Sequence, residues 1–165
     1  LTSWPALAEL SPAQRATFAA AINVEIDPAL VACRTIRNDV CIAGWYNTAA
    51  LPQTMAWRES VSKHDLFEAM NLTSFDALSA GKRDEWTLMM DNAPIAMSRN
   101  PMRKAVADIW GATDRDAILT SCTEPATRFE MVFGGSSATT GGVTAIKRTV
   151  LGPVSVSDVS AALNP

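Results

Sequence analysis

Apolar residues recur every three or four positions through most of the first 133 residues, which is the spacing of amphipathic α-helices. A capping residue followed by proline precedes several of these runs and is typical of a helix N-terminus, because the missing proline N–H costs nothing there. The strongest amphipathic pattern runs from Ser74 to Asn92, and Pro125 is expected to kink or split a later helix. The expected helix starts are Ser3 before Trp4-Pro5, Ser11-Pro12, Asp27-Pro28, Ser62, Asn100-Pro101 and Thr113.

The pattern changes at Gly134. Of the 16 residues from 134 to 149, ten are Gly, Ser or Thr, which predicts a flexible loop. Residues 143–151 are mostly good strand formers and predict one extended segment, and a final short helix begins at Ser155 or Ser157.

The sequence therefore predicts a mainly α protein, a helical bundle with a C-terminal loop and an extended β arm. The expected boundaries are 1–133 for the helical body and 134–165 for the loop, the arm and the short terminal helix. A single strand cannot satisfy its own backbone groups, and no second convincing strand is evident before residue 134. The arm is thus expected to pair with another chain; the alternative is a hairpin with residues 128–134. The arm residues expected to make the contact are Val143, Ile146, Lys147, Arg148, Val150 and Leu151.

Composition excludes several classes of protein. The chain has 165 residues, of which 48% are apolar and 19% charged, with a net charge of −3. A negative chain does not suit a nucleic-acid binder that works by neutralising phosphates. No apolar run approaches the ~18 residues of a membrane span, and the N-terminal residues do not resemble a signal peptide.

Three cysteines are present, Cys33, Cys41 and Cys122. If residues 28–48 form one helix, Cys33 and Cys41 lie about 12 Å apart along it, beyond the ~7 Å limit for a disulfide. Free buried thiols and a reducing compartment are therefore expected. The only histidine is His64 and no CxxC pair occurs, so no metal or cofactor site is expected.

Residues 60–63, Ser60-Val61-Ser62-Lys63, match the S-x-x-K motif of penicillin-recognising enzymes. The partner motifs S-D-N and K-T-G are absent, and Ser62 is a plausible helix cap. A small serine hydrolase using Ser60 and Lys63 remains an alternative, but no catalytic residue is expected.

Trp57 and Arg58 follow a proline break and precede a capped helix. Trp and Arg are enriched where proteins contact each other, so this pair is a candidate for contact with another subunit. The alternative is that Trp57 is an ordinary core residue.

A set of short motifs resembles a family of tailed-bacteriophage structural proteins, in the same order over about residues 50–165. The motifs are residues 56–63 (AWRESVSK), 65–69 (DLFEA), 75–78 (FDAL), 81–86 (GKRDEW), 100–101 (NP), 109–111 (IWG), 122–128, 133–134 (FG), 151–155 (LGPVS) and 158–159 (DV). The chain departs from the family pattern at 125–133, where Pro125 interrupts the helix.

The resemblance implies a head–tail connector, or adaptor, of the virion neck. Such a protein is not an enzyme: it assembles with itself into a ring of twelve copies, binds the portal protein and a downstream tail or neck protein, and lets genomic DNA pass through the lumen without sequence readout. The implied location is the neck or tail region of the virion, assembled in the host cytoplasm, with no membrane partner. Other virion roles, namely tail completion, minor tail protein or decoration, are alternatives.

Overall fold

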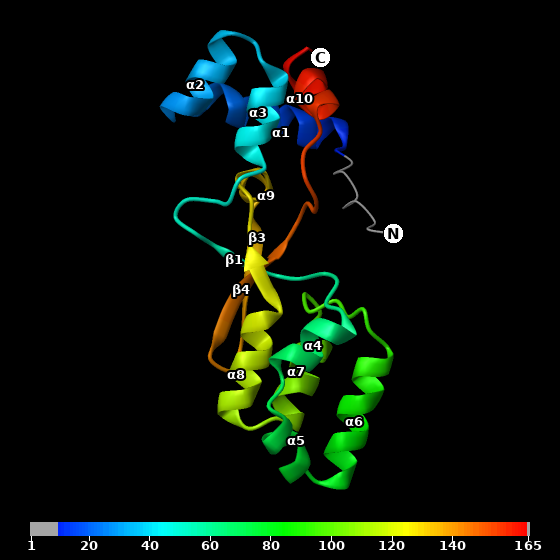
Figure 1. The fold of residues 1–165 in the computed structure, drawn as a ribbon. Helices are drawn as coiled ribbons and strands as arrows, with labels where there is room; N and C mark the ends of the chain where they lie inside the picture. The colour runs from blue at the N-terminus through cyan, green and yellow to red at the C-terminus, as the bar shows by residue number, and fades with distance from the viewer. Residues whose placement is uncertain (1–9, 165) are drawn as a thin grey trace. The chain divides into compact units, whose positions relative to one another are not determined.

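The structure, a computed structural model, describes residues 10–164, so the cap expected at Ser3 lies outside the described residues. These residues form ten helices and four strands (Figure 1). The chain divides into two compact units and passes between them four times. Among the described residues, unit 1 contains 10–54, 125–135 and 148–164, and unit 2 contains 55–124 and 136–147.

Unit 1 is helical. Three of its helices begin at the capping residues that the sequence indicates: Ser11 and Asp27, each followed by proline, and Ser155. The helices are α1 (Pro12–Val24), α2 (Pro28–Thr35), α3 (Asp39–Tyr46), α9 (Arg128–Val132) and α10 (Val156–Leu163).

Aromatic side chains hold the core of unit 1 together. The ring of Phe18 packs edge-on against Tyr46 at 4.9 Å and against Phe129 at 5.1 Å between ring centroids. Helix α10 packs against α1 and α3. The side chain of Asn47 binds both the N–H and the carbonyl of Val154, which fixes the chain just before α10.

Unit 2 combines helices with a small sheet. Its helices are α4 (Lys63–Ala69), α5 (Leu72–Ala77), α6 (Ala80–Asp91), α7 (Asn100–Ile109) and α8 (Ala112–Ser121). Its strands are β1 (Met55–Trp57), β2 (Thr123–Pro125), β3 (Gly135–Thr140) and β4 (Val143–Arg148), and their order in the sheet is β2-β1-β4-β3. Strands β1 and β4 run parallel, with Ala56 opposite Ile146. The centre of this unit's core is formed by Trp57, Leu66, Trp86, Val106, Ile118 and Leu119, all fully buried.

The structure corrects two helix predictions. Residues 28–48 do not form one helix: α2 ends at Thr35, Arg37 has a positive φ of 53°, and α3 begins at Asp39. Because the chain turns back here, the Cα atoms of Cys33 and Cys41 are 5.5 Å apart and the two residues form a disulfide. The expectation of free thiols was wrong for this pair.

The long amphipathic run is also interrupted. Helix α5 ends at Ala77, and Ser79 caps the separate helix α6, its side chain accepting a hydrogen bond from the N–H of Lys82. The helical periodicity continues across this break, which is why the two helices resemble one in the sequence.

The predicted loop at 134–149 is a β-hairpin. The Gly-, Ser- and Thr-rich residues form β3, and the predicted strand forms β4 between β1 and β3. The premise that the extended segment lacks a strand partner within its own chain was therefore wrong, and the hairpin partner is 135–140 rather than 128–134. The second neighbour, β1, has only three residues, too few for a recognisable strand pattern.

The fold is mainly α with a small mixed sheet, so the predicted class holds but the protein is not a pure bundle. Among the described residues, no single helix has the length and apolar character needed to cross a membrane. The bent pair α1 and α2 meets that requirement only when the two helices are taken together.

Candidate functional site

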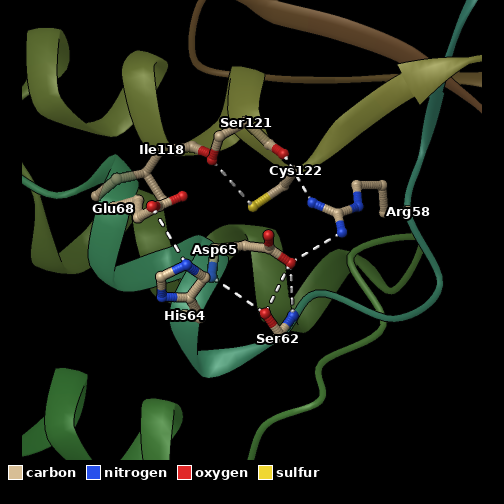
Figure 2. A network of polar contacts seen from close by, with 8 residues as sticks. All are labelled: Arg58, Ser62, His64, Asp65, Glu68, Ile118, Ser121 and Cys122. Atoms are coloured by element: carbon tan, nitrogen blue, oxygen red, sulfur yellow. Dashed lines mark hydrogen bonds and ion pairs between the residues drawn. The ribbon is translucent and has the colours of Figure 1, made fainter. Parts of the chain in front are cut away.

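Ser62 and Arg58 bind the carboxylate of Asp65 in unit 2 (Figure 2). One oxygen, Oδ2, accepts hydrogen bonds from the N–H of Ser62 at 3.1 Å and from its hydroxyl at 2.9 Å. The N–H of Asp65 donates back to the Ser62 Oγ at 3.1 Å. This reciprocal pair is a capping box that fixes the first turn of α4.

Arg58 connects this helix start to the rest of unit 2. Its guanidinium donates to Asp65 Oδ2 at 2.9 Å and to the carbonyl of Ser121 at 3.3 Å. Its backbone N–H donates to the carbonyl of Cys122, and its carbonyl accepts from the N–H of Met97. Arg58, which directly follows β1, thus connects the start of α4, the end of α8 and the segment before α7.

These bonds hold Asp65 in its charged form. The Ser62 hydroxyl and N–H, followed by the nearby Arg58, lower the pKa of Asp65 below its ordinary value. A carboxylate stabilised as an anion is a poor general base, since its affinity for a proton is reduced.

The two other reactive side chains in this region are unsuited to catalysis. Burial raises the pKa of the Cys122 thiol to about 11, so the nucleophilic thiolate is scarce at neutral pH. His64 lies on the surface, 3.2 Å from Glu68 one turn later on the same helix (Figure 2).

The residues of the hydrolase alternative are not brought together. The ammonium of Lys63 is 2.6 Å from Asp91 Oδ1, and Ser60 is exposed without a hydrogen bond to any described residue. A serine nucleophile needs a base within hydrogen-bond reach, and this arrangement does not supply one.

Trp57 is fully buried and matches the alternative interpretation, a core residue. Its indole N–H donates to the carbonyl of Ala138 at 3.3 Å. The guanidinium carbon of Arg103 lies 4.9 Å from the centroid of the indole ring. Arg58, its neighbour, is partly exposed but is occupied by the contacts above.

The arm residues differ in their accessibility. Lys147 and Leu151 are exposed, whereas Val150 is buried. Val143, Ile146 and Arg148 are half-buried, and the Arg148 side chain lies 3.1 Å from the buried carboxylate of Glu130. Lys147 and Leu151 are therefore the members of this set best placed to meet a partner.

Sequence reasoning missed Arg103, which is 3% exposed. Its guanidinium donates to the carbonyls of Met97 and Ser98 at 2.7 Å and to the Thr140 hydroxyl at 3.1 Å. No carboxylate among the described residues pairs with it, and burial lowers its pKa. Nothing in the sequence separates this arginine from its exposed neighbours Arg99 and Lys104.

An apolar groove of about 590 Å³ lies between α6 and α7. Its lining includes Leu88, Met89, Ile95 and Met102, with Arg99 among the few charged residues at its edge. Leu88, in this lining, is 66% exposed.

No cluster of three metal-binding side chains occurs among residues 10–164. Comparison with known proteins found no matching family model, no matching curated protein and no matching solved structure. The candidate site is, by its geometry, a set of polar contacts that connects the start of α4, the end of α8 and the segment before α7.

Proposed function

We propose that this protein is a structural subunit of a bacteriophage neck, forming a ring that joins the portal to the tail. The observation that carries the proposal is the ordered series of motifs over residues 50–165 that resembles tailed-phage structural proteins. Several of these motif residues are central to unit 2, including Trp57, Arg58, Leu66 and Trp86. The resemblance therefore concerns residues that build a fold, as expected for a protein whose role is assembly.

The polar chemistry supports a non-catalytic role. Asp65, Arg58 and Lys63, the charged residues of the S-x-x-K region, are each bonded to other side chains in structural contacts. In the proposed assembly the partners are further copies of the chain, the portal and a downstream tail protein, with DNA passing through the lumen. Lys147 and Leu151 at the end of the arm provide the subunit or portal contact.

The first test is assembly. The purified protein, alone and mixed with portal, is examined by light scattering after size exclusion and by negative-stain electron microscopy. Rings or portal-bound rings are expected from the wild type. The double variant K147E/L151S should keep its helical circular dichroism and lose assembly. The matched control Lys104→Glu alters an exposed lysine on α7 and should assemble normally.

The second test is location. Cryo-electron microscopy of the particle should place the chain between portal and tail. Density at the tail tip or on the capsid shell would instead support a minor tail or decoration role. In the assembly test, normal ring formation by K147E/L151S would show that the contact lies on another surface of the subunit.

A further inference from the structure

Strand β3 forms one edge of the sheet, and no other strand among the described residues pairs with its outer side. The strand order β2-β1-β4-β3 gives it one neighbour, β4. Apart from its ladder with β4, β3 makes no backbone hydrogen bond to another part of the chain between residues 10 and 164. Its six residues are exposed or half-buried, and none is buried.

The free groups of this edge can be assigned from the hairpin geometry. Two residues, Gly141 and Gly142, join β3 to β4, so the strands are antiparallel, and the Thr139 and Thr144 hydroxyls meet at 2.8 Å. In such a hairpin the pair next to the turn, Thr140 and Val143, exchanges hydrogen bonds, and bonded pairs then alternate along the ladder. The N–H and C=O groups of Gly135, Ser137 and Thr139 therefore face away from β4.

This edge also lacks the features that protect an exposed strand from pairing. Such strands usually carry a lysine, a proline or a bulge. The sequence of β3 is Gly-Ser-Ser-Ala-Thr-Thr, without a charge or a proline. The opposite edge of the sheet, β2, has three residues and ends in Pro125, and proline cannot donate to a ladder.

We propose that β3 pairs antiparallel with β3 of a second copy, about a twofold axis at Ser137. In this register Ser137 lies opposite the second copy's Ser137, and Gly135 opposite its Thr139. Each of the three outward residues exchanges both of its backbone bonds, giving about six hydrogen bonds across the contact. The small side chains let the backbones approach.

The occupant follows from the composition of the edge. Identical strands pairing about a twofold axis place like residues near one another, and like charges in that position would repel. Because β3 carries no charge, it can pair with β3 of a second copy without electrostatic repulsion. A different protein that selects its partner by opposite charge would find no charged residue on β3 to bind. This contact closes with two copies, so it is separate from a head-to-tail ring contact and does not rest on the proposed function.

The test uses charge at the axis. Sedimentation equilibrium of the K147E/L151S variant, in which the ring contact is removed, should show a dimer over a range of concentrations, and the substitutions at position 137 are made in this parent. Ser137→Lys and Ser137→Glu each place like charges opposite one another and should raise the dimer dissociation constant about tenfold or more. An equimolar mixture of the two variants should restore the dimer, because the charges then attract.

Two controls separate this contact from a general effect. Thr87→Lys adds the same charge at an exposed position on α6, away from β3, and should leave the dimer unchanged. Ser137→Pro removes one outward N–H without touching the ladder to β4, and it should weaken the dimer even if a charged variant folds poorly. Three results would overturn the proposal: a monomeric K147E/L151S parent, a dimer that the substitutions at position 137 do not weaken, or a mixture of the two charged variants that stays monomeric.

Discussion

Asp65 and its neighbours show how one carboxylate fixes three segments of chain. The Ser62 hydroxyl caps α4, and Arg58 carries the same contact to the end of α8. The serine two positions earlier, Ser60, shares the motif but makes no such contact. Of these two serines, only Ser62 therefore has a structural role in the fold.

We expect Ser62→Ala to lower the free energy of unfolding by about 1 kcal/mol, because a helix N-terminus loses its capping oxygen. Ser60→Ala should leave stability unchanged. Urea unfolding of both variants, followed by circular dichroism, measures the difference. Equal stability of the two variants would show that the capping box contributes nothing.

Asp65→Asn should change how the free energy of unfolding depends on pH. The folded-state pKa of Asp65 is lowered, so its stabilising contribution is present above the unfolded pKa of about 4 and is lost as pH falls through the folded value. The wild type should have a larger free energy of unfolding than Asp65→Asn at neutral pH, and this difference should become smaller below about pH 4. Unfolding free energies measured from pH 7 to pH 2.5 test this; a gap that widens in acid would contradict it.

At the scale of elements, the β3–β4 turn depends on a close approach. Gly141 has a φ of +59°, and a Cβ placed there would meet Arg115 and lie 2.5 Å from Asp116 Oδ1. The N–H of Gly142 donates to the same carboxylate oxygen at 3.0 Å. The turn is therefore held against the first half of α8 by contacts that leave no room for a side chain.

Gly141→Ala should therefore destabilise the protein by more than about 1 kcal/mol. Gly81→Ala is the matched control, because Gly81 lies within α6 with open space around it. That control should stabilise the protein by about 0.5–1 kcal/mol through helix propensity. Thermal unfolding of both variants measures whether each substitution lowers or raises stability. If Gly141→Ala leaves stability unchanged, the turn can move away from α8.

The disulfide between α2 and α3 should contribute about 2.5 kcal/mol, since it closes a short loop in the unfolded chain. Reductant should lower the stability of the wild type by that amount, measured as the shift in urea midpoint. The double variant C33S/C41S should be less stable and insensitive to reductant. A wild type unaffected by reductant would show that the bond contributes nothing.

The sequence predicted the elements that carry local signals and missed those set by distant contacts. Ser11, Ser62 and Ser155 were recognisable as caps because a side chain bonds a backbone N–H three residues later. The disulfide was missed because the helix break at Arg37 leaves the apolar periodicity intact. Strand β1 was missed because three residues carry no period, and its pairing with β4 joins positions 90 residues apart, Ala56 and Ile146. The burial of Arg103 was equally invisible, since the ring of Trp57 and the hydroxyl of Thr140, which lie against its guanidinium, are far from it in the sequence.

For the whole molecule, we expect weak contact with DNA and no sequence preference. The net charge is −3, and few phosphates can be neutralised by basic side chains that lie among acidic ones. Gel-shift assays at low salt with two unrelated duplexes should show equal, weak binding that disappears at physiological salt. Tight binding to one duplex would contradict the proposed role as a conduit.

The division of both units between separated stretches of chain has a consequence for synthesis on the ribosome. Unit 2 has all of its residues once Lys147 has emerged, whereas unit 1 still lacks α10, Val156–Leu163, at that point. Helices α1 and α3, which α10 covers, are translated before unit 2. Their apolar surfaces stay uncovered on the nascent chain while the whole of unit 2 is produced. Unit 1 therefore starts before unit 2 and is completed after it, and it exposes the apolar surface that chaperones bind.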